Sequence, residues 1–284
     1  MSHRRLTLAR LALTTALLVA AIPASAGAGL LPPGLLPSGP PVTIAGNEAS
    51  VTLGLAGLSI ELTLEFEQVV GLTPAGLGIT SRLVNPVELV GRLPDTLISL
   101  PAALPLLVSV EPPAAGGLSF SGVTTVGVHT HNLPFVADSP LRLYKASVGG
   151  PFVDITESMG TGSYRARGST GGFSQFLILV DLRPTSAVVE QKLDTLDALL
   201  ASSGIGGPLR SDLDARLATA RSRWDSGNVV GAIGSVEGFA AAVKTAADAG
   251  LVPNVWRSAR DLNNVAGNLR AAAGTLRFSL ALAE

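Results

Sequence analysis

The stretch SIELTLEFEQV, residues 59–69, alternates polar and apolar side chains through residue 67. Successive side chains of an extended strand point to opposite faces, so this period of two predicts a β-strand with one buried face. Gly71 and Pro74 follow it and predict a turn that ends the strand. The face toward the core would carry Ile60, Leu62, Leu64 and Phe66.

Short β segments continue to about residue 183, separated by turn signals such as Gly116-Gly117, Gly149-Gly150-Pro151 and Gly171-Gly172. Many short strands between regular turns are typical of two packed antiparallel sheets, so we expect a β-sandwich over residues 42–183. The further expected strands are 79–83, 87–89, 106–110, 119–131, 141–145, 152–156, 163–167 and 173–182.

At Pro184 the apolar period changes from two to about 3.6, which predicts helices from there onward. Short connections between them imply antiparallel neighbours. The predicted fold class is therefore α+β, with an antiparallel β-sandwich followed by an antiparallel four-helix domain at 184–284. The expected helices are 186–201, 209–225, one from an N-cap at Asn228 to about 249, and a fourth from Pro253.

The N-terminus carries an export pattern. Three arginines precede an uncharged apolar run at 11–22, and the small residues Ala24-Ser25-Ala26 follow Pro23. This order predicts a cleavable secretory signal peptide over residues 1–26, because the apolar run is shorter than the ~20 residues that an uncleaved membrane anchor needs. The expected mature chain is periplasmic or extracellular, and it begins with a Pro/Gly-rich spacer at 27–41.

Composition excludes several classes of function. The chain has no cysteine, which excludes disulfides, thiol catalysis and cysteine-ligated zinc. Removal of the three N-terminal arginines leaves a mildly acidic chain without a basic patch, so nucleic acid is not an expected partner. Residues 97–110 are the most apolar later stretch, but Pro101 and Pro105 interrupt it, and no transmembrane span is expected after signal cleavage.

Several stretches carry a family resemblance. They are VHTHNLPFV, SPLRLYKASVGGPFVDIT and GGFSQFLILVDLRP within 126–182, and PNVWRSARDLNNVAGNLRAAAGTLRFSL near the C-terminus. These stretches resemble a family of exported bacterial proteins of unknown function, and the resemblance covers most of the mature chain. It implies no catalytic residue. Separately, the expected helical hairpin at 209–250 is similar to the FIMAH domain, which implies an appended interaction module.

His129 and His131 are the only histidines after the signal peptide. At positions i and i+2 of a strand both imidazoles project to the same side, which is a legitimate beginning for a metal site. Asp138 and Asp154 are candidates for a third ligand. The alternative is a structural histidine pair that bonds the backbone near the strand end, facing away from Phe120, Val126 and Val128.

Other polar patterns favour no catalytic site. Glu61, Glu65 and Glu67 share the polar face of the 59–69 strand, where paired carboxylates could hydrolyse glycosides but solvation or protection of an edge strand explains them as well. The stretch Gly172-Phe173-Ser174-Gln175-Phe176 lacks the second glycine of a nucleophile elbow. No phosphate-binding loop is present either, and no cofactor is expected.

The fourth expected helix carries a polar stripe. Asp261, Asn264 and Asn268 are spaced at i, i+3 and i+7, so they would line one face. They would form a polar ligand groove between helices or, as we favour, a hydrogen-bonded seam between the two domains.

The sequence therefore predicts an exported, non-enzymatic binding or structural protein of the bacterial envelope or extracellular space, with an unknown protein or envelope component as partner. The alternative is a metal-binding protein or metal-dependent hydrolase that uses His129 and His131. A third possibility is that an apolar surface binds a lipid or a partner chain.

Overall fold

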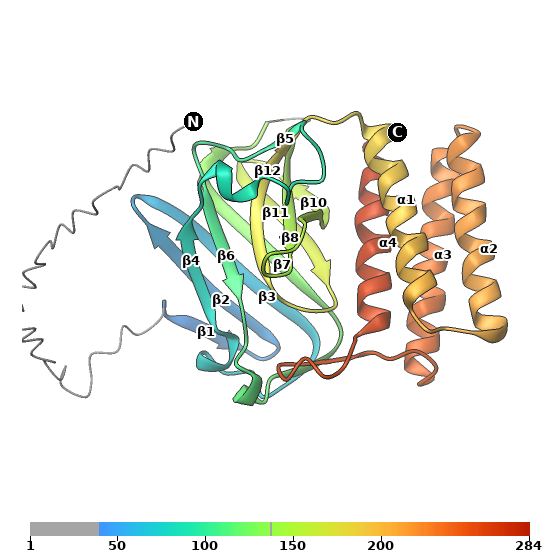
Figure 1. The fold of residues 1–284 in the computed structure, drawn as a ribbon, viewed down its shortest axis with the longest axis horizontal. Helices are drawn as coiled ribbons and strands as arrows, with labels where there is room; N and C mark the ends of the chain where they lie inside the picture. Colours follow the sequence, from blue (N-terminus) through green and yellow to red (C-terminus); the bar gives the residue numbers. More distant parts are fainter. Residues whose placement is uncertain (1–39, 137) are drawn as a thin grey trace, which may run out of the picture. The chain divides into compact units, whose positions relative to one another are not determined.

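A computed structural model describes residues 40–136 and 138–284 (Figure 1). The predicted signal peptide and nearly all of the predicted spacer lie outside these residues. The described part consists of two antiparallel β-sheets followed by four helices, so the predicted α+β fold class is confirmed.

The first sheet has the strand order β1-β2-β3-β7-β11-β10, with all neighbours antiparallel. Residues 59–69 lie within β3, and Ile60, Leu62, Leu64 and Phe66 are buried as predicted. Because β2 and β7 flank β3, it is not an edge strand, and its glutamates cannot protect an edge. The strands are β1 Val42–Ala45, β2 Glu48–Leu55, β3 Leu58–Val70, β7 Ser119–Pro134, β10 Thr156–Gly160 and β11 Ser163–Thr170.

The second sheet has the order β4-β6-β12-β8-β9, and β5 pairs with β12. The two sheets pack face to face, since one core cluster contains Leu64 and Val126 of the first sheet and Leu143, Phe176 and Ile178 of the second. The strands are β4 Ile79–Leu83, β5 Ile98–Ser99, β6 Leu106–Val110, β8 Leu141–Ala146, β9 Val153–Asp154 and β12 Gln175–Asp181.

The helices build a separate apolar core around residues such as Leu193, Leu217, Phe239 and Leu276. The first three helices lie close to their predicted bounds, and the Asn228 side chain accepts a hydrogen bond from the Gly231 backbone N–H, as expected of an N-cap. The helices are α1 Thr185–Ser202, α2 Gly207–Asp225, α3 Val229–Asp248 and α4 Val265–Ala281.

Three predicted elements differ from the structure. The strand expected at 152–156 is divided between β9 of the second sheet and the start of β10 of the first. Residues 87–89 are not a strand but part of a 3-10 turn, Pro86–Leu89, because Asn85 and Glu88 form a reciprocal capping box around it. The fourth helix does not start at Pro253: it begins at Val265, and Val255–Arg257 form a strand, β13. This strand pairs with Ser119–Ser121 of β7, where β11 no longer covers the edge of β7.

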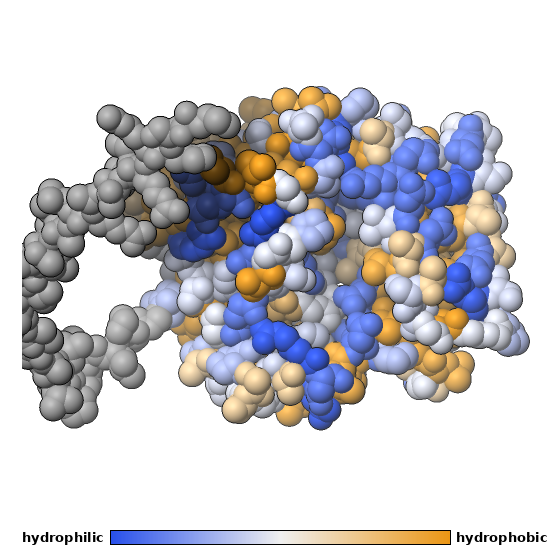
Figure 2. All heavy atoms as spheres, in the orientation of Figure 1, coloured by the Kyte–Doolittle hydropathy of each residue, from blue (hydrophilic) through white to orange (hydrophobic). Residues whose placement is uncertain are grey.

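The helices pack against the sandwich through α1 and α4. Helix α4 contacts β7, β10 and β11, and Gly267 is close enough to β7 that an added Cβ would lie 2.6 Å from the Gly122 carbonyl oxygen. On the face drawn in Figure 2, hydrophilic and hydrophobic residues are interspersed over both the sheets and the helices. The described residues form one compact unit, and the junction between the sheets and the helices is a packed contact within it.

Among the described residues, α3 is the one helix whose length and mean hydropathy would suffice to cross a membrane. Residues 97–110, the most apolar later stretch of the sequence, contain the strands β5 and β6. Helix α3 contributes Ala232, Val236, Phe239 and Val243 to the core of the helical part.

Candidate functional site

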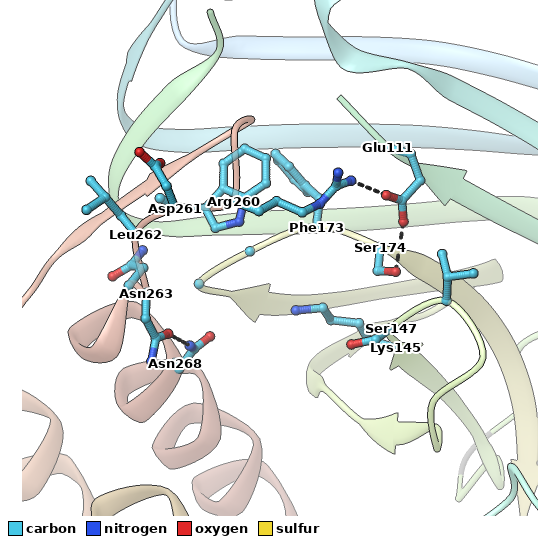
Figure 3. Close-up of a pocket in the computed structure, with 15 residues that line it drawn as sticks. Glu111, Lys145, Ser147, Phe173, Ser174, Arg260, Asp261, Leu262, Asn263 and Asn268 are labelled. Carbon is cyan, nitrogen blue, oxygen red and sulfur yellow. Dashed lines mark hydrogen bonds and ion pairs between the residues drawn. The ribbon is translucent and has the colours of Figure 1, made fainter. Parts of the chain in front are cut away.

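A cavity of about 820 Å³ opens where one end of the sandwich meets the segment that leads into α4 (Figure 3). Four described parts of the chain line it: Glu111 directly after β6, the end of β8 with the residues that follow it, the turn between β11 and β12, and the segment from β13 to the first turn of α4. The residues used below are Lys145, Gly171, Ser174, Arg260, Asn263 and Asn268, with Glu111 at one side.

Lys145 is the central charge of this cavity. Along β8 the inward side chains are Leu141, Leu143 and Lys145, and Lys145 pairs across the sheet with buried Phe176. The lysine therefore points between the two sheets, where its ammonium donates a hydrogen bond to the Thr170 hydroxyl of β11. Burial lowers the pKa of Lys145 to about 8, because desolvation disfavours the charged form.

The other charges around the cavity are paired. The Arg260 guanidinium forms an ion pair with the Glu111 carboxylate, which also accepts a hydrogen bond of 2.9 Å from the Ser174 hydroxyl. Asp261 pairs with Arg257, from which it accepts a hydrogen bond of 3.1 Å at Oδ1. Within the described residues, Lys145 alone of the charged groups lining this cavity makes no ion pair. A bound anion would give the Lys145 ammonium the counter-ion that it lacks.

The predicted polar stripe lies at this cavity, although not on one helix. Asp261 precedes α4, Asn264 is its N-cap and Asn268 belongs to its first turn. The amide of Asn264 is fully buried, accepting from the Gly267 N–H at 2.8 Å and donating to the Gly122 carbonyl at 2.7 Å. Asn264 therefore joins α4 to β7. Asn268 keeps its side chain at the cavity and donates to Asn263 at 3.2 Å (Figure 3).

Glycine is required where the β11–β12 turn meets α4. A Cβ at Gly171 would lie 2.6 Å from the Asn268 backbone nitrogen, and one at Gly172 would lie 3.0 Å from the Trp256 ring. Trp256 stacks on Phe120 with ring centroids 5.3 Å apart, so it is a core anchor. These contacts hold the turn, and with it one wall of the cavity, directly against α4.

A second cavity of about 260 Å³ lies between α1, α4 and the end of the sandwich. Lys145, Gly171 and Asn268 line both cavities, so the two spaces meet at these residues. The rest of the second cavity is mainly apolar, and its other charged side chains, Asp154, Arg183 and Lys192, are all in ion pairs. The apolar lining includes Phe152, Ile155, Leu199, Ala271 and Ala272.

His129 and His131 lie elsewhere, on the outer face of the first sheet. Their rings are 4.7 Å apart, so they project together as their spacing predicted. Both ring nitrogens of His129 are already engaged: Nδ1 lies 2.8 Å from the Glu61 carboxylate, and Nε2 lies 2.7 Å from the Ser163 hydroxyl. Sequence reasoning missed Ser163, because only the pairing of β11 with β7 brings it beside the histidine.

The proposed third ligands do not join the histidines. Asp154 is buried and bonds Lys192 and Thr156, while Asp138 sits in a loop at φ +58°. Over the described ranges, no group of three histidine or acidic side chains is placed to hold a metal ion. Among the described residues, Glu61 is the one acidic side chain that pairs with either histidine, and it pairs with His129.

Two of the three β3 glutamates and Ser174 have polar partners among the described residues. Glu67 forms an ion pair with Arg270 of α4, whose hydrogen bond lowers the pKa of the carboxyl against the opposing effect of burial. Glu61 faces His129, so these two glutamates of β3 serve different partners. Ser174 donates to Glu111 and is not paired with a histidine.

A family model described as a family of unknown function, DUF6689, matches residues 14–284. The chain belongs to this family. The match spans both sheets and all four helices, so the sandwich and the helical part occur together in DUF6689. No curated protein matches the chain. Because membership of DUF6689 brings no activity, the chemistry of the site has to be argued from its own residues.

Proposed function

We propose that the chain is an exported, non-enzymatic binding protein that takes a small organic anion in the cavity at Lys145. The observation that carries this proposal is the unpaired ammonium of Lys145, in a cavity whose other charges are neutralised within the chain. Lys145 is partly buried, and a desolvated cation without a counter-ion costs folding free energy that a bound anion would offset.

Binding is favoured over catalysis by the partners of the polar groups in the cavity. Ser174 bonds an ion-paired carboxylate, and Asn264 is committed to the backbone on both sides. Among the described residues that line the cavity there is no histidine, so a hydroxyl nucleophile would lack its usual base. The arrangement can orient and neutralise a ligand.

The export part of the proposal rests on sequence. The arginines, apolar run and Ala24-Ser25-Ala26 site within residues 1–26 support a location in the periplasm or outside a bacterial cell. The hairpin of α2 and α3, with its Gly227-Asn228 turn, is the part we propose as a FIMAH-like module for contact with an envelope component.

Titration of the purified protein with benzoate and hexanoate tests anion binding. We expect both to raise the melting temperature of the wild type, and we expect Lys145→Met to lose that response. Lys244→Met is the matched control, because Lys244 is an exposed lysine paired with Asp248 on α3. An equal response in Lys145→Met, or no response to either anion in the wild type, would refute the proposal.

A metal site at His129 and His131 is the second candidate. It is favoured by the 4.7 Å separation of the two rings and by the Glu61 carboxylate at His129. Elemental analysis of the purified protein beside His131→Ala decides it. One equivalent of metal in the wild type that is absent from His131→Ala would establish this site. A metal-free wild type, together with a His131→Ala protein as stable as the wild type, would eliminate it.

A further inference from the structure

The charge of Lys145 indicates an anionic ligand, and the position of Lys145 between two cavities indicates what the rest of that ligand is like. Lys145, Gly171 and Asn268 border both the larger polar cavity and the smaller apolar one. Any molecule whose anionic group reaches the ammonium therefore lies beside a side chain that also borders the apolar space between α1 and α4. A ligand that uses both spaces would be charged at one end and hydrophobic at the other.

The second cavity has the lining that a hydrocarbon chain requires. Phe152 and Ile155 come from the sandwich, Leu199 comes from α1, and Ala271 and Ala272 come from α4. Alanines on this face of α4 leave room that larger side chains would fill. At roughly 30 Å³ for a group the size of a water molecule, a volume of about 260 Å³ holds a chain of about eight to ten carbon atoms.

The other charged side chains that line this cavity are paired among the described residues. Lys192 donates to Asp154 at 2.6 Å and to Thr275 at 2.7 Å, and Arg183 is paired with Asp181 at 2.7 Å. Of the charged side chains that line either cavity in the described ranges, only Lys145 has no ionic partner. One uncompensated positive charge beside an apolar space matches a ligand with one negative charge and an alkyl tail.

We infer that the ligand is an amphipathic monocarboxylate of medium chain length, with its carboxylate at Lys145 and its alkyl chain in the cavity between α1 and α4. The Asn268 side chain, which lines the same junction, supplies an amide N–H for the second carboxylate oxygen. This inference rests on the proposed function and names the class of anion that the site takes.

Isothermal titration with acetate, hexanoate, decanoate and 1-decanol tests it. Each methylene group that enters the cavity should tighten binding roughly three- to fourfold. We expect decanoate to bind at least tenfold more tightly than hexanoate, and at least tenfold more tightly than the uncharged decanol. Lys145→Met should weaken decanoate binding at least tenfold and leave decanol unchanged, and Lys145→Gln repeats this arm in case the first variant does not fold.

Filling the apolar cavity is the complementary arm. Ala272→Leu on α4 should weaken decanoate at least tenfold but leave hexanoate within about threefold, because the shorter chain needs less of the space. Thr195→Phe, at an exposed position of α1 that borders the same cavity, is the second filling variant. Ala240→Leu on α3 is the matched control, since Ala240 lies outside both cavities.

The outcomes separate the inference from the proposed function. Hexanoate and decanoate that bind equally, with a shared dependence on Lys145, would overturn the inference and leave anion binding in place. Decanoate that binds tightly to Lys145→Met would also overturn it, because the alkyl chain would then bind without a contact between the carboxylate and the lysine. Carboxylates of every length that fail to bind the wild type would remove both.

Discussion

Lys192 of α1 and Asp154 of β9 form an ion pair of 2.6 Å in which neither side chain is more than 9% exposed. The lysine also donates to the Thr275 hydroxyl at 2.7 Å and to the Ser279 hydroxyl at 2.9 Å, both on α4. One ammonium therefore ties two helices to the edge of the second sheet. Its hydrogen bonds fix how the helical part sits against the sandwich, and so they fix the width of the apolar cavity between them.

Loss of one member of this pair should be costly. Lys192→Met leaves a buried carboxylate at Asp154 without its cation, and we expect the free energy of unfolding to fall by about 3–5 kcal/mol. Replacement of both residues, with Asp154→Leu added to Lys192→Met, should recover most of that loss because no buried charge remains. Urea denaturation followed by circular dichroism measures both values. A double variant as unstable as the single one would show that the hydrogen bonds to α4, and not the charge, dominate.

The buried pair of Asp181 and Arg183 predicts a loss of stability in acid. Burial alone would raise the pKa of Asp181, but hydrogen bonds from Arg183 and Tyr144 outweigh it and the pKa is lowered. The folded chain thus holds this carboxylate ionised to lower pH than the unfolded chain does. Its contribution is present above the ordinary pKa of about 3.9 and is lost as pH falls through the folded value.

Comparison of the wild type with Asp181→Asn isolates the contribution of the Asp181 carboxylate to the free energy of unfolding. We expect the variant to be about 3 kcal/mol less stable at pH 7, since Arg183 loses its buried counter-ion, and we expect the difference to narrow below about pH 4. Urea unfolding from pH 2 to pH 7 gives the two curves. Asp212→Asn is the control, because Asp212 forms an exposed pair on α2. Parallel curves for wild type and Asp181→Asn would contradict the assignment.

Local patterns predicted the elements that depend on a single periodicity. The alternation in β3 placed its four inward side chains correctly, and Asn228 marked the start of α3. The pattern misled at residues 253–264, where Val255 and Leu262 fit a helical spacing by chance. Trp256 packs on Phe120 and Arg260 takes φ +55°, so this segment follows the sandwich until Asn264 caps α4.

The candidate site was harder to predict, because it depends on contacts between distant segments. The spacing of Asp261, Asn264 and Asn268 predicts a polar stripe, and all three residues line the cavity. No sequence motif marks Lys145 as a site residue. Its position on the inward side of the strand, two residues after Leu143, is the one sequence feature that could have indicated it. A lysine at an inward position is uncommon, but only the approach of Thr170 and α4 turns that position into a cavity.

The predicted signal peptide can be tested directly. Expression of the full chain in a bacterial host should yield a processed protein whose first residue is Gly27, as measured by intact mass and N-terminal sequencing. Ala26→Leu should block cleavage and leave the precursor, because signal peptidase requires a small residue there. Ser38→Leu, beyond the predicted site, is the matched control. An unprocessed wild-type chain in the cytoplasmic fraction would contradict export.

Lys145 should cost the protein stability in return for its binding role. Desolvation holds its pKa at about 8 in the folded chain, against about 10.4 when unfolded. Between these values the unfolded state binds more protons, so stability rises with pH there, and at pH 7 the charged lysine carries the full penalty.

Lys145→Met keeps a similar volume without the charge, so we expect it to be about 2 kcal/mol more stable than wild type at pH 7. That advantage should shrink as pH rises toward about 10. Thermal unfolding of both proteins at pH 7 and pH 10 measures the difference, with Lys244→Met expected to track the wild type throughout. A Lys145→Met protein that is less stable than wild type at pH 7 would show that the lysine is held there for its bond to Thr170 and not for a ligand.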